Sequence, residues 1–394
     1  MSCNTLRIPA HTRMNRYSKH YKMSPPTSPK ESDGDVAFRK MLERIRLNDT
    51  NPGSPPQLVP QETPQTFKKI GDGGCSAVFA QEGRSLAMKI SKKPIFGLWN
   101  DYSMHSLIYE QMESFEIGIN IPKCYFFVPK EDLEFLDTNL DLIEAAQDVC
   151  DVPTDIIVSE RIPPLEEAMR SVLIDEYCDP ELKSSASADP ANNDCLVRIY
   201  LGSTKGRISE TSFSLRDFEL HLNQMIELDL DAERMASVIA QALAVMHWAA
   251  RTDAMGVQFV LGGSKKPLIP SYSKIEEMEP STYTGPKSRV IGDFFRGRTV
   301  LWLLNFDQVR PIKMNHEGVN QAVQAAAISG RYLPKRFSRG KTEKLVWDRF
   351  QKEYLETADF ILQYEDKKLQ QLPLHFLKEV ANIELLAKTS WTRG

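Results

Sequence analysis

Hydrophobic periodicity changes once along the chain, and this change constrains the fold more than any other feature. Five short β-like runs come first, at residues 66–70, 77–81, 85–90, 123–128 and 155–160. Longer stretches with helical spacing come later. Strands that precede helices predict an α+β protein with segregated layers.

The clearest helix lies in the middle of the chain. Its apolar residues recur at i, i+3, i+4, i+7, i+8 and i+11, and Asp231 is placed to cap its first turn. Apolar spacing also predicts a helix at 101–112 and two helices near the C-terminus. The residues that form the central stripe are Met235, Val238, Ile239, Ala242, Leu243 and Met246.

Residues 1–66 differ from the rest. They hold nine of the 24 prolines and few large apolar residues, so we expect a disordered tail, apart from a short helix at 36–45. The first thirty residues are basic, which fits either an anion-binding or targeting arm or a solvated tail. Four Ser/Thr-Pro pairs occur here, and Ser28-Pro29-Lys30 is the best candidate site for a proline-directed kinase. Equally, Ser, Thr and Pro are common in any disordered segment.

Composition excludes several classes of protein. The net charge is −4, which argues against a protein that coats nucleic acid. No run approaches the roughly eighteen apolar residues of a membrane span, and the six cysteines are scattered, so we expect a cytoplasmic or nuclear protein with reduced thiols. Neither C-x-x-C nor H-x₃₋₅-H spacing occurs, so we expect no zinc site.

A glycine-rich segment, 71–78, stands between two predicted strands. Glycines there allow a tight turn and a close approach to phosphate oxygens, although simple hairpin turns are also rich in glycine. Lys89 follows within an apolar strand, where an unpaired ammonium would be costly, so it needs a partner or must extend its amine to water. Glu110, on the helix predicted at 101–112, is the candidate partner.

These elements, in this order, resemble the N-terminal lobe of protein kinases and kinase-like phosphotransferases. The family pattern is G-x-G-x-x-G-x-V, then A-x-K, then a helix Glu, and here Ser76 replaces the third glycine. The resemblance implies that 67–162 form a β-rich lobe with a hinge, and that Lys89 holds nucleotide phosphates and is oriented by Glu110. It also implies cofactor-binding residues, which are Gly71, Gly73, Gly74, Val78, Lys89, Glu160 and Ile162.

The second half continues the resemblance with departures. Residues 163–394 would form a helical lobe with an insertion at about 262–298. Asp253 is the candidate catalytic base, but Arg251 replaces the usual histidine before it. Gln258 replaces the metal-binding Asn, and Asn305 replaces the metal-binding Asp. Losing that carboxylate should weaken Mg²⁺ and ATP binding, unless Asp307 substitutes for it.

The chain is also similar, over about residues 68–363, to a family of filamentous-fungal proteins with no established substrate. Residues 253–262 and 301–308 carry this resemblance. The family is sometimes described as zinc finger proteins, a description for which this sequence offers no ligands.

Three functions follow as hypotheses. The first is a degenerate kinase-like fold that binds a nucleotide or a protein partner in a regulatory role. The second is an active ATP-dependent phosphotransferase that acts on a small molecule in the cleft between the lobes. The third, with least support, is a zinc-finger-type DNA-binding regulator.

Overall fold

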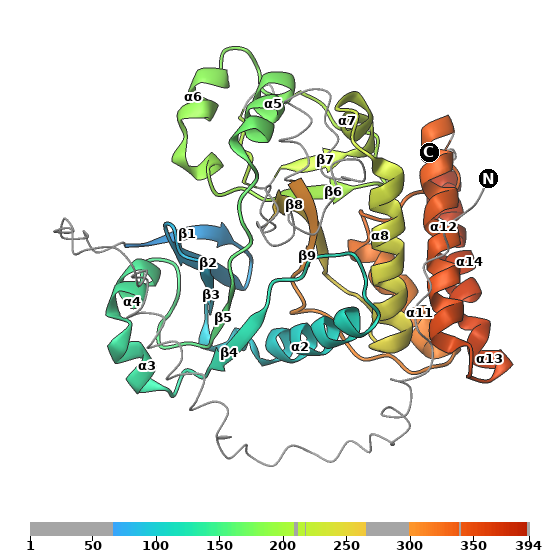
Figure 1. Ribbon diagram of the computed structural model, residues 1–394, viewed down its shortest axis with the longest axis horizontal. Coiled ribbons are helices and arrows are strands. Elements are labelled where there is room, and N and C mark those ends of the chain that lie inside the picture. The colour runs from blue at the N-terminus through green and yellow to red at the C-terminus, as the bar shows by residue number, and fades with distance from the viewer. Residues whose placement is uncertain (1–65, 209–211, 217, 265–298, 339, 392–394) are drawn as a thin grey trace, which may run out of the picture. The chain divides into compact units, whose positions relative to one another are not determined.

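A computed structural model describes residues 66–208, 212–216, 218–264, 299–338 and 340–391 (Figure 1). The chain divides into two units, 1–63 and 64–394, and only the second contains described residues. The predictions for the N-terminal tail, including the helix at 36–45 and the site at Ser28, therefore lie outside the described residues. Most of the predicted insertion, 265–298, does as well.

The first sheet contains the five strands predicted from the sequence, each within two residues of its predicted bounds. It is antiparallel with the order β1-β2-β3-β5-β4. Apolar residues on alternate positions of these strands pack against two short helices, α3 (Leu133–Thr138) and α4 (Leu140–Ala146). The strands are β1 (Phe67–Asp72), β2 (Ser76–Gln81), β3 (Leu86–Ser91), β4 (Cys124–Val128) and β5 (Ile156–Glu160).

Helix α2 (Trp99–Ser114) joins β3 to β4, with a 3₁₀ turn at Pro94–Phe96 before it. Its buried residues are spaced at helical intervals and face the second, larger hydrophobic cluster of the protein. The helix thereby connects the first sheet to the remainder of the fold.

A second sheet has the order β7-β6-β8-β9, in which β6 and β7 are parallel and the other pairs are antiparallel. Strands β8 and β9 form a hairpin, and the insertion connects them. The insertion was predicted to begin at 262, but Gly262 and Gly263 belong to β8 and pair with β9. The strands are β6 (Val197–Tyr200), β7 (Glu219–His221), β8 (Gln258–Gly263) and β9 (Thr299–Leu304).

The long helices pack beside this sheet. In α8 (Ala232–Ala244), the predicted cap is confirmed, because the Asp231 carboxylate accepts a hydrogen bond from the backbone N–H of Arg234 at 2.9 Å. A π-helical turn, Val245–Ala249, continues it. Helix α8 packs on α12 (Lys341–Leu362), which in turn contacts α14 (Leu372–Trp391) (Figure 1).

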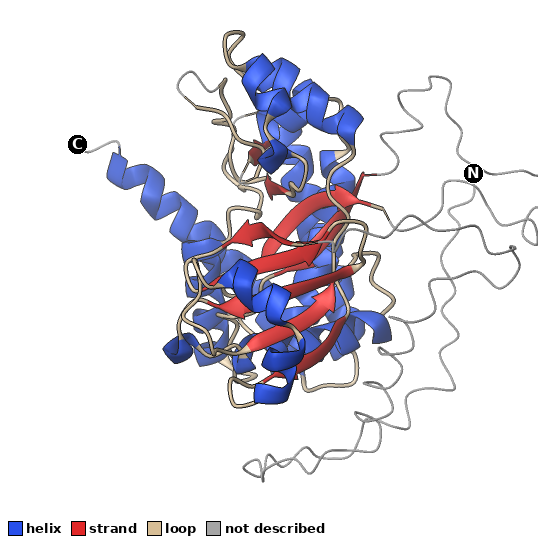
Figure 2. Cartoon of the chain, turned by 90° about the vertical axis from the view of Figure 1, so that its left-hand side faces the viewer, coloured by secondary structure: helices blue, strands red, loops and turns tan. Residues whose placement is uncertain are grey.

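Two further helices complete this region, α11 (His316–Ser329), which packs on α14, and α13 (Lys367–Gln370). Figure 2 shows the strands running through the middle of the described fold with helices around them. The mixed α+β class is therefore confirmed, with antiparallel pairing predominating in both sheets.

Residues 163–231 contain short elements that the sequence did not predict, α5 (Glu167–Tyr177), α6 (Lys183–Ala188), a 3₁₀ turn at Pro190–Asn192, and α7 (Leu222–Glu227). Among the residues that the structure describes, no helix combines the length and the apolar composition needed to cross a membrane. The five described cysteines are all free thiols.

Candidate functional site

A cavity of about 630 Å³ lies where the glycine-rich turn faces the end of β9, and we call it the cleft cavity. It is lined by the turn and by β3, by the end of β5, and by residues that follow β9. The structure brings together here most of the predicted site residues. These are Gly71, Gly73, Gly74, Val78, Lys89, Glu160, Ile162, Gln258, Asn305 and Asp307.

The Lys89 ammonium has a carboxylate partner, but not the predicted one. Its Nζ lies 2.5 Å from Asp101 Oδ2 and 3.2 Å from Asn305 Oδ1. The Asp101 side chain is 4% exposed and that of Lys89 is 18% exposed, so the ion pair is largely removed from water. Asp101 also accepts a hydrogen bond from the backbone N–H of Phe306 at 3.1 Å. This carboxylate joins β3, α2 and the turn after β9.

The prediction that Glu110 pairs with Lys89 is therefore wrong, and helix geometry explains why. The buried face of α2 carries Asp101, His105, Ile108 and Met112, spaced by four, three and four residues. Glu110 follows Ile108 by two residues, which turns it about 200° around the helix, and its side chain is exposed. The same spacing, read from the sequence, could have identified Asp101 as the acidic residue on the inner face.

The first turn of α2 also fixes the segment after β9. The Asn100 side chain donates hydrogen bonds to the carbonyl oxygens of Asp307, at 2.8 Å, and Val309, at 3.1 Å. The Asp307 carboxylate lines the cleft cavity, and its Oδ1 is buried with no hydrogen-bond partner in the described part of the chain. A buried carboxylate oxygen without a donor is costly, so a cation or a donor from a ligand would stabilise it.

Asp253, the predicted base, is buried outside the lining of the cleft cavity. Its Oδ1 accepts hydrogen bonds from the backbone N–H groups of Met255, at 3.0 Å, and Arg310, at 2.9 Å. Its Oδ2 accepts another from Gln321 Nε2 at 2.9 Å. The prediction that Asp253 lines the cavity is wrong, because this carboxylate instead ties its own loop to the segment 310–321.

The two loops nonetheless meet beside the cavity. Asn305 Nδ2 donates to the carbonyl oxygen of Gly256 at 3.0 Å, and the N–H of Asp253 donates to Arg310 at 3.0 Å. Arg251, with φ of 55°, and Asn305, with φ of 71°, occupy the left-handed region. Strained backbone of this kind gathers at binding and catalytic sites.

The glycine-rich turn is closed by a hydrogen bond from Gly73 N–H to the Ser76 carbonyl at 2.8 Å. Asp72 within it pairs with Lys69 at 2.7 Å and with Lys92 at 2.5 Å. Hydrogen bonds from Lys69 and then Lys92 lower the pKa of the Asp72 carboxyl. At Gly74, an added Cβ would meet nothing within 4 Å, and φ is outside the left-handed region. The protein fold alone therefore does not require glycine at position 74.

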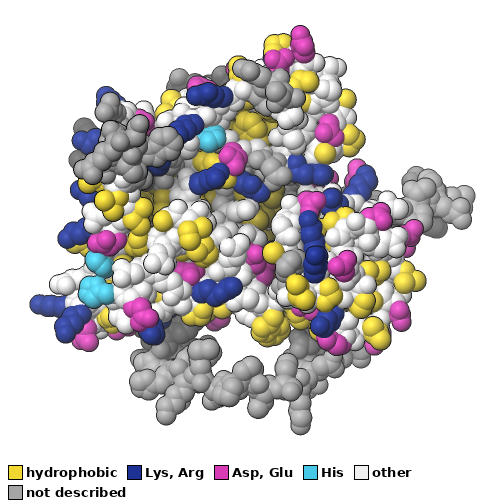
Figure 3. All heavy atoms as spheres, turned by 180° about the vertical axis from the view of Figure 1, so that it is seen from behind, with side chains coloured by type: hydrophobic (Ala, Val, Ile, Leu, Met, Phe, Trp, Pro, Cys, Tyr) yellow, Lys and Arg dark blue, Asp and Glu magenta, His cyan; other side chains and the backbone are white. Residues whose placement is uncertain are grey.

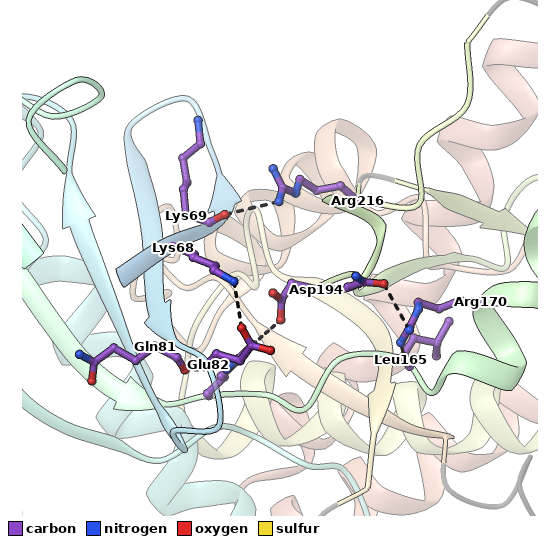
Figure 4. A network of polar contacts seen from close by, with 10 residues as sticks. Lys68, Lys69, Gln81, Glu82, Leu165, Arg170, Asp194 and Arg216 are labelled. Carbon is purple, nitrogen blue, oxygen red and sulfur yellow. Dashed lines mark hydrogen bonds and ion pairs between the residues drawn. The ribbon is translucent and has the colours of Figure 1, made fainter. Parts of the chain in front are cut away.

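A polar network that the sequence did not predict borders the cavity on the side of residues 163–231. Arg161 forms an ion pair with Asp194, and both line the cavity. The Arg216 guanidinium extends to the carbonyl oxygen of Lys69, 3.4 Å away, and so links this region to β1 (Figure 4). No sequence motif predicts these contacts, because the residues that form them are far apart in the sequence.

Burial shifts the pKa values of two side chains near the Lys89–Asp101 pair. It lowers the pKa of His105, whose Nε2 donates to the carbonyl oxygen of Pro122 at 2.7 Å, so the imidazole is neutral near pH 7. It raises the pKa of the Cys124 thiol to about 12, which keeps this cysteine protonated and unreactive.

Oxygen atoms on Asn305, Asp307 and Gln258 could contribute to a Mg²⁺ site, but only Asp307 would bring a charge. Within the described ranges, no group of three or more His, Cys, Asp or Glu residues is arranged to hold a metal ion. This donor set therefore offers Mg²⁺ a single charged ligand.

One face of the described part of the chain lacks a concentrated basic patch. On the face shown in Figure 3, basic and acidic side chains are interspersed rather than gathered in fields of one sign. A phosphate backbone is bound by concentrated positive charge.

Comparison with known protein families gives a match over part of the chain. A family model described as "Zinc finger protein" matches residues 301–366, which span most of β9 and all of α11 and α12. This stretch contains one histidine, His316, and no cysteine, so it cannot supply the four ligands of a structural zinc site. No curated protein matches the chain. The matched stretch does include Asn305 and Asp307, so the similarity extends over part of the cleft cavity.

Proposed function

We propose that this chain has a degenerate kinase-like fold that binds a nucleotide through its phosphates in the cleft cavity, and that it acts by binding rather than by phosphoryl transfer. One observation carries the proposal: Lys89, held by the Asp101 carboxylate, lies in the same cavity as the glycine-rich turn. A fixed ammonium and a turn that brings backbone N–H groups close are complementary to phosphate oxygens.

The order of elements supports a kinase-like fold. A lysine on the third strand of an antiparallel sheet is followed by a helix with an inward acid, as in protein kinases. The first sheet has its own hydrophobic cluster, separate from the larger one around α8 and α12. In this proposal the two clusters correspond to the two lobes, and the volume of about 630 Å³ suits a nucleotide-sized ligand.

The state of the catalytic positions favours binding over transfer. Asp253 is buried outside the lining of the cleft cavity, so a substrate in that cavity would reach it only after its loop rearranged. Asn305 stands where a metal carboxylate is expected, and its Oδ1 accepts from Lys89. When bound, Mg²⁺ would neutralise phosphate charge. In this proposal, the Lys89 ammonium neutralises that charge instead.

An active phosphotransferase is the second candidate, and one observation favours it. The buried Oδ1 of Asp307 has no partner among the described residues and faces a cavity that Lys89 also lines. If Asp307 held the metal, ATP binding would depend strongly on Mg²⁺.

A thermal-shift titration with ATP, with and without Mg²⁺, tests the proposal, because a ligand that binds only the native state raises the melting temperature. We expect a rise that is similar in both conditions. Gly74→Ala should retain the melting temperature of the free protein but lose more than half of the rise. Gly118→Ala is the matched control, because an added Cβ there also meets nothing within 4 Å.

Two further variants separate the candidates. Asn305→Asp restores a carboxylate and should make the rise depend on Mg²⁺, while Asp307→Ala should leave the metal-free rise unchanged. A large Mg²⁺-dependent rise that Asp307→Ala abolishes, together with ATP turnover, would establish the enzyme instead. No rise with any nucleotide would refute nucleotide binding and favour a protein partner.

A further inference from the structure

A second cavity, of about 250 Å³, adjoins the cleft cavity, and we call it the side cavity. Strand β6, the segment that leads into β8, and the loop after α11 form its walls. Arg198, Gln258, Asn305 and Gln308 line both cavities, so the two share a wall. The residues that line the side cavity alone include Tyr200, Gly256, Ser329, Arg331 and Tyr332.

Two arginines line the side cavity. Arg198 and Arg331 contribute two guanidinium groups, and none of the described residues that line the cavity is acidic. The Glu219 carboxylate lies 3.4 Å from Arg331 and also accepts a hydrogen bond from the Tyr200 hydroxyl at 3.2 Å. The Arg331 side chain is 65% exposed, so this ion pair is weak and a ligand can exchange with it.

The fold holds Arg331 in place over the cavity. The Gly202 N–H, just beyond β6, donates to the Arg331 carbonyl oxygen at 3.1 Å. The guanidinium lies over the Tyr200 ring, with its carbon 5.4 Å from the ring centroid. Ser329, the last residue of α11, accepts a hydrogen bond from the Gly256 N–H at 3.1 Å. The loop is therefore attached to both walls, and its arginine is oriented before any ligand binds.

On this geometry, the structure assigns to the side cavity a second ligand, a small organic molecule whose carboxylate or phosphate group is bound by Arg198 and Arg331. Planar guanidinium groups match such oxyanions with paired hydrogen bonds. The volume of about 250 Å³ is below that of most drug-sized sites, which limits the ligand to a small metabolite. The assignment goes beyond the proposed nucleotide site and does not require it.

Isothermal titration calorimetry on the full chain without nucleotide tests the assignment. The probes are succinate, inorganic phosphate and the neutral analogue succinamide, each over the millimolar range at constant ionic strength set with chloride. We expect succinate or phosphate to bind and succinamide not to bind. Preference for succinate identifies a carboxylate ligand, and preference for phosphate identifies a phosphate ester.

Two arginine variants locate the site. Arg331→Gln should weaken binding of the preferred anion at least about five-fold, since it removes one of two charged donors. Arg336→Gln is the matched control, because Arg336 is also exposed and lies over an aromatic ring, 5.5 Å from the Phe337 centroid, but is outside the side cavity. It should change the affinity less than two-fold.

Two results would overturn the assignment: neither anion binds, or both arginine variants weaken binding equally. Arg331 does not line the cleft cavity, so Arg331→Gln should leave the ATP-induced thermal shift unchanged. Failure of the ATP shift with retained succinate or phosphate binding would refute the nucleotide proposal alone.

Discussion

Replacing Asp101 with Asn tests the centre of the cleft cavity. The substitution keeps the shape of the side chain but removes the charge that pairs with Lys89 at 2.5 Å. Breaking a buried ion pair from one side costs about 3–5 kcal/mol, because the remaining charge stays buried without a partner. Lys89 is 18% exposed and keeps its contact with Asn305, so we expect the lower end, a loss of about 3 kcal/mol in the free energy of unfolding.

Urea denaturation followed by circular dichroism measures this loss, and Glu110→Gln is its control. Glu110 lies on the same helix but is exposed, so its substitution should change the free energy of unfolding by less than about 0.5 kcal/mol. A double-mutant cycle with Lys89→Met should give a coupling free energy of roughly 1–3 kcal/mol between positions 89 and 101. An equal loss in Asp101→Asn and Glu110→Gln would refute the pairing between Lys89 and Asp101. Negligible coupling between positions 89 and 101 would also refute it.

Three other predictions concern the loops and the core. Gly256→Ala should destabilise the protein by about 1–2 kcal/mol more than Gly83→Ala, as measured by urea denaturation. Both glycines have positive φ, but of the two only Gly256 would place an added Cβ against a neighbouring side chain, that of Gln308 at 3.1 Å. Burial lowers the pKa of His247 from 6.5 to about 3. The contribution of the neutral His247 to the free energy of unfolding is therefore complete above pH 6.5. It falls by up to about 1.4 kcal/mol per pH unit as the pH decreases towards 3. Denaturation at pH 7 and pH 5 should detect this loss, and His247→Gln should flatten the slope. Asp253→Asn should lower the free energy of unfolding by about 2 kcal/mol through lost loop contacts; an unchanged stability would contradict its structural role.

The first sheet and the long helices could be predicted because each follows one period over enough residues. Alternation at every second position identified β2 and β3, and the stripe in α8 was long enough to predict its cap at Asp231. The elements between residues 163 and 231 were missed for the opposite reason. Helices of six residues, such as α6 and α7, contain less than two turns. Their local sequence hardly differs from that of a loop, and tertiary packing decides that they form.

The cleft cavity was partly predictable. The resemblance to kinase-like sequences suggested which strands and loops carry the site residues, and the fold places most of these residues around one cavity. The partner of Lys89 was missed because counting residues from the lysine located the helix but not its inner face. Asp101 occupies the position at which the apolar stripe through Ile108 reaches the first turn. A charged residue on an otherwise apolar stripe is the signal that distinguishes the buried acid from Glu110.

The side cavity has almost no local signal in the sequence. Arg198 and Tyr200 alternate on β6 and therefore share a face, but Arg331 comes from a loop more than a hundred residues later. The hydrogen bond from the Gly202 N–H to the Arg331 carbonyl oxygen holds these groups at one cavity. If the side cavity binds its anion while the cleft cavity binds nucleotide, Asn305 and Gln258 lie in the wall between the two ligands. The amides of Asn305 and Gln258 would then be contacts between two bound anions, where an uncharged donor is tolerated better than a carboxylate.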